Sequence, residues 1–283
     1  MASEPVRAGA GWLQLREPAD AEARSGELVD ILRPHLPTSP LEIHDLGGGT
    51  GSMARWLAPR LDGPQRWVLH DRDAELLHLA DKLPAPRSRN GAHVTVATRI
   101  GDITRLDASE LAGASLITAS ALLDMFTADE VDRLVAICAG VGCPVLVTLS
   151  VVGRVELVPA DPWDERVMEA FNAHQRRPSQ SGRLLGPGAA AAAIDGFERA
   201  GLEVLQRPSP WRLTPDRTAL AAEWFTGWIR AALQQDPSLV EAAAPYALRR
   251  QAEVAARTAS ITVNHLDFLA LPCPIERGPG GCR

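Results

Sequence analysis

The sequence predicts an α/β fold: a doubly wound, mostly parallel seven-stranded sheet with helices on both faces and a helical lid from insertions. Two observations support this prediction. Short apolar segments alternate with helical patterns between about residues 41 and 150, as in successive β–α–β units. Two further segments with the composition of strands follow later in the chain. A chain of 283 residues is also long enough to bury one large core.

Seven segments have the apolar composition of strands. Each is bounded by glycine, proline or polar residues, which interrupt regular structure. The predicted strands are Leu41–Leu46, Arg66–His70, His93–Ala97, Leu116–Ala119, Pro144–Ser150, Leu202–Arg207 and Ile261–Leu269. The last of these carries the Ile, Thr, Val and Phe content that strands favour.

The segment after the fifth predicted strand, residues 151–188, is interpreted as an insertion. It contains a predicted helix, Asp164–Arg176, followed by a polar, glycine-containing stretch, Arg177–Gly188. Open α/β sheets bind ligands beyond the carboxyl ends of their strands. Because the insertion follows such an end, we expect it to form a lid over the binding site.

A second insertion, residues 209–258, has a helical pattern. Trp224 and Trp228 lie one turn apart on an apolar face, which favours a core or subunit contact over an aromatic pocket wall. We expect residues 1–271 to form one domain that includes both insertions. Residues 272–283 are rich in glycine and proline and predict a disordered tail. Whether the protein forms a homodimer is left open.

The composition excludes several classes of partner. No apolar run approaches the roughly 18 residues of a membrane span, and the first residues lack a secretory signal, so we expect a cytoplasmic protein without membrane contact. A net charge of −6 argues against a nucleic-acid-binding protein. The cysteines lack the paired spacing of a zinc site, so we expect no metal. A small molecule is the expected partner.

The first predicted strand runs directly into a glycine-rich bend. Glycines permit left-handed turns and let a ligand approach the backbone closely. A dinucleotide fingerprint, GxGxxG, requires a third glycine where this chain has Ser52, so the spacing disfavours NAD. The residues of this bend that we assign to a nucleotide-like ligand are Asp45, Gly47, Gly48, Gly49 and Gly51.

This bend resembles the first motif of the class I, Rossmann-like S-adenosylmethionine-dependent methyltransferases. That motif is an acidic residue, a hydrophobic residue and then GxGxG, and residues 45–51 match it throughout. The resemblance implies a methyltransferase whose cofactor is S-adenosyl-L-methionine. The specific motifs cover residues 41–124.

Asp71 stands at the end of the second predicted strand, twenty positions after Gly51. In the family that the chain resembles, the acid at this place binds the ribose of the cofactor. A carboxylate suits this role because it accepts hydrogen bonds from both ribose hydroxyls. We assign Arg72 to the same edge of the site. Asp73 better fits the N-cap of a predicted helix, Ala74–Asp81.

The segment Gly101-Asp102-Ile103 follows the third predicted strand. It resembles the family's Gly-Asp-hydrophobic element. The resemblance implies that the Asp102 carboxylate accepts the adenine amino group and that Ile103 packs on the ring. Gly101 completes this part of the predicted site.

Three further residues are assigned from their positions near these motifs. Ser120 follows the fourth predicted strand, where the family places the methionine part of the cofactor. Asp124 is a candidate for binding cofactor or acceptor, and equally for capping a helix that starts near Asp129. Arg24 lies in a predicted N-terminal helix that follows Asp20 and ends before Pro34, of the kind that closes over the cofactor in this family. It is a candidate partner for the cofactor carboxylate, with a surface arginine as the alternative.

The predicted reaction is methyl transfer to a small-molecule acceptor. Such an in-line displacement mainly requires alignment of the reactants and exclusion of water. A hydroxyl or ammonium acceptor must also lose a proton, and His174 on the predicted lid helix and Asp124 are the candidate bases. Two alternatives remain: an aminopropyl-transferring relative that uses decarboxylated cofactor, and a nonenzymatic cofactor-binding or scaffold protein of the same fold.

Overall fold

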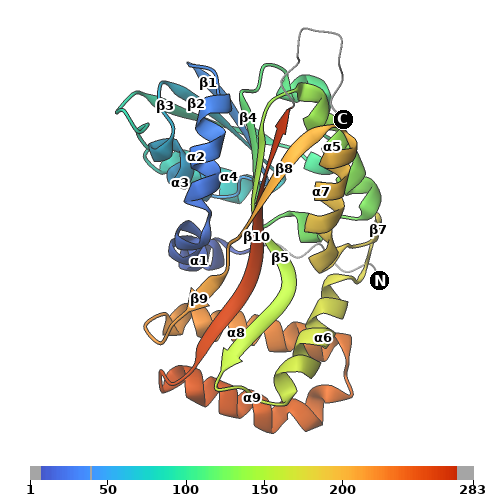
Figure 1. Cartoon of the computed structure of the whole chain (residues 1–283). Helices are drawn as coiled ribbons and strands as arrows, with labels where there is room; N and C mark the ends of the chain where they lie inside the picture. Colours follow the sequence, from blue (N-terminus) through green and yellow to red (C-terminus); the bar gives the residue numbers. More distant parts are fainter. Residues whose placement is uncertain (1–7, 39, 273–283) are drawn as a thin grey trace.

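The computed structural model describes residues 8–38 and 40–272 (Figure 1). The expected tail, apart from Pro272, lies outside these residues. The strands are β1 Leu41–Leu46, β2 Gln65–Asp71, β3 Val94–Ile100, β4 Leu116–Ser120, β5 Val145–Val158, β6 Pro178–Ser179, β7 Gly182–Arg183, β8 Leu202–Pro208, β9 Trp211–Leu213 and β10 Ser260–Pro272. The helices are α1 Ala10–Ala23, α2 Gly26–Leu32, α3 Ser52–Leu57, α4 Ala74–Lys82, α5 Ala128–Val141, α6 Trp163–Gln175, α7 Ala189–Arg199, α8 Thr218–Gln235 and α9 Leu239–Ala255.

Seven strands follow the order β3-β2-β1-β4-β5-β10-β8, and β9 pairs with the far part of β10. The pairs among β1 to β5 are parallel, and β10 runs antiparallel to β5 and β8. Leu46 at the end of β1 lies opposite His70 in β2 and Ala119 in β4. The carboxyl ends of these three strands therefore meet at one edge of the sheet.

Successive residues of the central strands face opposite sides of the sheet, and each side is covered by helices. Ile43 belongs to an apolar cluster that includes residues of α2, α3 and α4. Leu46 belongs to a second cluster that includes residues of α5 and α7. Apolar residues on both faces of the strands, each face covered by helices, are typical of a parallel sheet that is buried on both sides. The predicted doubly wound fold is confirmed. Each of the seven predicted strands overlaps an observed one.

The prediction that the fifth strand stops at Ser150 is wrong. The chain continues as β5 to Val158, because β10 pairs with it as far as Ser260, opposite Val158. Gly153 adopts a left-handed conformation (φ +75°) within the strand. The long β5–β10 pair leads to a layer of α6, α8 and α9, at the bottom of Figure 1.

This layer has its own apolar core, to which α6, α8, α9 and the far parts of β5 and β10 contribute. Trp228 is buried in it, and the partly buried Trp224 stacks on Trp228 with ring centroids 5.3 Å apart. The core interpretation of this helix face is therefore confirmed. Within residues 8–38 and 40–272, no helix combines the length and apolarity needed to cross a bilayer.

A buried ion-pair network joins α9 to α6. The Arg250 guanidinium is buried, and its Nη2 donates to both carboxylate oxygens of Asp164 at 2.8 and 2.7 Å. Its Nη1 donates to Glu253 Oε2 and to the Pro159 carbonyl oxygen, both at 2.7 Å. The Tyr246 hydroxyl donates to Asp164 at 2.8 Å. Asp164 therefore serves the packing of this helical layer.

We expect Arg250→Met to lower the free energy of unfolding by roughly 2–4 kcal/mol, because it leaves the Asp164 carboxylate in a poorly solvated place without its partner. Arg249→Met is the matched control. Arg249 pairs with Asp161 but its side chain is 48% exposed, so we expect a loss below about 1 kcal/mol. Urea denaturation of both variants measures these losses, and equal losses contradict a structural role for the network.

Candidate functional site

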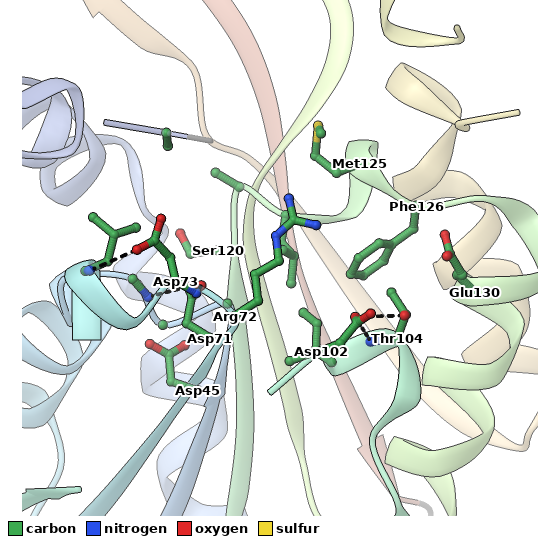
Figure 2. Close-up of a pocket in the computed structure, with 18 of the residues that line it drawn as sticks. Asp45, Asp71, Arg72, Asp73, Asp102, Thr104, Ser120, Met125, Phe126 and Glu130 are labelled. Carbon is green, nitrogen blue, oxygen red and sulfur yellow. Dashed lines mark hydrogen bonds between the residues drawn. The ribbon is translucent and has the colours of Figure 1, made fainter. Parts of the chain in front are cut away.

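A cavity of about 630 Å³ lies at the edge where β1, β2 and β4 end. Figure 2 shows Asp45, Asp71, Arg72 and Asp102 on one side of it, and Met125, Phe126 and Glu130 on the wall next to α5. The predicted cofactor residues that line it are Arg24, Asp45, Gly47, Gly48, Gly49, Asp71, Arg72, Gly101, Asp102, Ile103 and Ser120. Gly51 is the one predicted member outside the lining.

The glycine bend is packed too tightly for larger residues. A Cβ on Gly48 would lie 2.9 Å from Leu69 Cβ and 3.2 Å from Asp45 Oδ2. Gly51 sits at the start of α3 with φ +80°, a conformation that favours glycine. The Gly47 and Gly48 N–H groups donate to the His70 carbonyl oxygen at 2.8 and 3.0 Å. The bend is therefore fixed against β2, and Gly51 shapes it from behind the cavity.

Asp71 holds the loops on either side of it. Its Oδ2 accepts the Gly49 N–H at 2.9 Å, and its Oδ1 accepts the Asp73 N–H at 2.9 Å. Each oxygen keeps a further lone pair for a ligand. Asp73 accepts the Glu75 and Leu76 N–H groups as the N-cap of α4, which confirms its predicted structural role.

Asp102 begins a short 3₁₀ helix, Ile103–Arg105. Its Oδ1 accepts the Thr104 N–H at 3.0 Å and the Thr104 hydroxyl at 2.8 Å. The side chain is 47% exposed, and its Oδ2 lies 3.9 Å from Arg105 Nε, which is itself on an exposed side chain. The arrangement leaves an acceptor available for an N–H group of a ligand.

The guanidinium of Arg24 is buried at the cavity and only partly paired. Its Nη2 donates to Ser120 Oγ at 3.0 Å and to Ser52 Oγ at 3.2 Å. Its Nε and Nη1 are buried without a hydrogen-bond partner. Burial lowers the pKa of this guanidinium. Buried donors are rarely left unpaired in proteins, so this side chain fits an anionic ligand group, and the surface-arginine alternative is wrong.

Asp45 lies below the glycine bend and is 2% exposed. The Thr118 hydroxyl donates to its Oδ1 at 2.8 Å. Burial raises the pKa of Asp45 to about 7, while the hydrogen bond from Thr118 and the charge of Arg24 act in the opposite direction. The Asp45 carboxyl therefore titrates near neutral pH at the floor of the cavity.

The two predicted bases lie outside the cavity lining. His174 is on α6, and its side chain hydrogen-bonds with Gln234 at the end of α8. Asp124 is partly buried next to α6, where it accepts a hydrogen bond from Gln175 Nε2 at 3.3 Å, and burial raises its pKa. The alternative that Asp124 caps a helix is wrong, because Thr127 is the N-cap of α5.

Three segments line the cavity that the motifs did not identify. Leu13, Arg16 and Asp20 come from α1, and the start of α5 contributes Thr127, Asp129, Glu130 and Arg133. The hairpin of β6 and β7 contributes residues 177–181. The predicted lid stretch therefore does line the cavity, held there by the Leu185 N–H, which donates to the Phe126 carbonyl oxygen at 2.8 Å. The helical part of that insertion, α6, does not line the cavity.

Within residues 8–38 and 40–272, no group of His, Cys, Asp and Glu side chains is arranged to hold a metal ion.

No model of a known protein family matches the chain, and no curated protein sequence matches it. Solved structures similar to it include a cyclopropane synthase from Mycobacterium tuberculosis, with 12% identity, a TM-score of 0.48, and coverage of 93% of this chain and 94% of that one. A SAM-dependent methyltransferase from Methanosarcina mazei has 13% identity and a TM-score of 0.45, over 65% of this chain and 88% of that one.

A phosphoethanolamine N-methyltransferase from Haemonchus contortus has 14% identity and a TM-score of 0.44, over 95% of this chain and 61% of that one. Similarities at this level carry no conclusion about the ligand or the reaction of this chain.

We expect Asp45→Asn to become more stable relative to the unsubstituted protein as pH rises from 4 to 7. The unfolded Asp45 ionises near pH 4, whereas the buried carboxyl stays protonated to about pH 7, so the protein loses stability across this interval. The difference in free energy of unfolding should grow by roughly 2–4 kcal/mol. Buried His44 and His70 affect both proteins equally.

Urea denaturation at several pH values measures this difference. Asp132→Asn is the control, because the Asp132 side chain is 63% exposed and a flat difference is expected. A flat difference for Asp45→Asn as well contradicts protonation of the buried carboxyl.

Proposed function

We propose that this protein is an S-adenosyl-L-methionine-dependent methyltransferase that acts on a small-molecule acceptor by in-line methyl transfer. The observation that carries the proposal is that Arg24, whose Nε and Nη1 are buried without a hydrogen-bond partner, lines the same cavity as Asp71 and Asp102. A ligand with a carboxylate, a ribose and an aminopurine satisfies all three side chains. S-Adenosyl-L-methionine has these three groups.

Each lining residue has a role in this proposal. Arg24 binds the cofactor carboxylate through a charge-assisted pair of hydrogen bonds. Asp71 accepts the ribose hydroxyls with its remaining lone pairs, and Asp102 accepts the adenine amino group. Ile103 packs on the purine ring. The backbone of the glycine bend approaches the ligand closely because no Cβ intervenes.

When bound, the cofactor supplies an electrophilic methyl group on a sulfonium. The protein's own contribution is alignment and exclusion of water. Helix α1 covers one side of the cavity and is tied to α3 by Glu17 and Arg55, with Arg55 Nε donating at 2.7 Å. The β6–β7 hairpin covers the other side. Polar residues of the hairpin and apolar Met125 and Phe126 surround the space left for an acceptor.

His174 and Asp124 remain predictions as proton acceptors. Neither side chain lines the cavity, so proton removal by either requires a change in the surrounding structure or a water-mediated path. The cytoplasmic location, the absence of nucleic-acid binding, the single domain over residues 1–271 and the homodimer also remain predictions.

The aminopropyl-transferring alternative is disfavoured by the same guanidinium. A decarboxylated cofactor has no anion to pair with Arg24, so the buried Nε and Nη1 would stay unsatisfied, which is costly. A nonenzymatic protein that binds the intact cofactor remains the second candidate function. Methyl transfer to an acceptor, detected as formation of S-adenosylhomocysteine, separates it from an enzyme.

Calorimetry tests the cofactor proposal directly. We expect S-adenosylmethionine and S-adenosylhomocysteine to bind more tightly than the decarboxylated cofactor and than NAD. Asp71→Ala should weaken S-adenosylhomocysteine binding by roughly 1–3 kcal/mol, because buried ligand hydroxyls lose their acceptor. His174→Ala is the control and should keep the affinity of the unsubstituted protein. Tightest binding of NAD, or equal affinity for Asp71→Ala, contradicts the proposal.

A further inference from the structure

Asp267 in β10 is fully buried and joins two distant segments of the chain. Its Oδ2 accepts the Ser25 N–H at 2.8 Å, and its Oδ1 accepts the Leu149 N–H at 2.7 Å. These partners are 242 and 118 residues away in the sequence. Asp267 does not line the cavity, so it acts on a ligand only through other residues.

The first partner adjoins the buried arginine. Ser25 follows Arg24 directly and is the N-cap of α2. Arg24 has extended backbone (φ −57°, ψ 135°), so the chain leaves α1 at this residue and turns toward the cavity. The hydrogen bond from the Ser25 N–H to Asp267 thus fixes the point from which the guanidinium projects.

The second partner adjoins the other end of the same guanidinium. Leu149 has φ +56°, a left-handed conformation that costs free energy for a residue with a Cβ. Its neighbour Thr148 donates from Oγ1 to Ser120 Oγ at 3.0 Å, and Ser120 Oγ in turn accepts from Arg24 Nη2. Asp267 therefore fixes both the base of the Arg24 side chain and the hydroxyl that receives its tip.

The charges around Arg24 also stabilise its guanidinium in the buried position. Arg24 is buried near three carboxyl groups, those of Asp20, Asp45 and Asp267, which favour its charged form. Burial raises the pKa of Asp267, whereas its backbone donors and Arg24 favour the carboxylate. Asp20 is already paired with Arg16 through Nε at 2.9 Å and with the Trp211 Nε1–H.

We propose that Asp267 is a positioning residue that holds the Arg24 guanidinium in the cavity and thereby selects a cofactor that carries a carboxylate over its decarboxylated form. The proposal rests on the proposed function. It assigns selectivity to a residue that contacts Arg24's backbone neighbour and not the ligand.

The experiment disturbs the hydrogen bond between the Ser25 N–H and Asp267, once at the acceptor and once at the donor. Asp267→Asn replaces one acceptor oxygen with an amide nitrogen of similar size. Ser25→Pro removes the Ser25 N–H, and the backbone allows it, because Ser25 has φ −70° and the preceding Arg24 has ψ 135°. Ser25→Ala is the matched control, since it removes the capping hydroxyl and keeps the N–H.

The measured quantity is the ratio of dissociation constants for S-adenosylhomocysteine and its decarboxylated form, determined by calorimetry. For Asp267→Asn and Ser25→Pro, we expect the preference for S-adenosylhomocysteine to fall about tenfold or more, the effect of weakening a hydrogen bond between charged groups. Affinity for the decarboxylated form should change by less than about threefold. Ser25→Ala should keep the original ratio.

An equal loss of affinity for both ligands, or an unchanged ratio, overturns the proposal and leaves the proposed function intact. If Asp267→Asn does not fold, Ser25→Pro alone decides between these results. If the unsubstituted protein binds neither ligand, the proposed function fails, and the proposal fails with it.

Discussion

The parallel register of three adjacent strands determines where the cavity lies. Leu46 in β1 is opposite His70 in β2 and Ala119 in β4, so the chain leaves all three strands at one level. The glycine bend, Asp71 and Ser120 follow within one residue of that level. Backbone pairing, and not attraction between these side chains, therefore brings them together. The carbonyl of His70 adds to this by holding the glycine bend against β2.

Burial of charge distinguishes this cavity from an ordinary surface cleft. A buried guanidinium and a buried carboxyl are each unfavourable alone, and they are tolerated when they neutralise one another. Here the balance is incomplete, because Arg24 keeps unpaired N–H groups while Asp45 is shifted toward its neutral form. Such a site is poorly satisfied by protein groups alone. A ligand with an anionic group supplies the hydrogen-bond acceptors that Arg24 lacks.

Local signals in the sequence predicted much of the fold and of the glycine bend. Strand β1 was predicted at its observed bounds, and Asp73 was predicted as a helix cap, because both depend on neighbouring residues. The far half of β5 was missed, because its pairing with β10 depends on a segment more than 100 residues away. His174 faces α8 through the rotation of α6, which residue spacing does not reveal. Asp267 lies in an apolar strand without a motif, so no sequence signal linked it to Arg24.

The contact between Ser25 and Asp267 also constrains the order of folding. The contact joins a residue near the beginning of the described chain to one in its last strand, and β10 lies inside the sheet between β5 and β8. Contacts so distant in sequence form late, because closing a long loop costs entropy before any contact forms. Until β10 takes its place in the sheet, the Ser25 N–H lacks its acceptor, the Asp267 carboxylate. The anchoring of Arg24 by Asp267 is therefore expected only after β10 has joined the sheet.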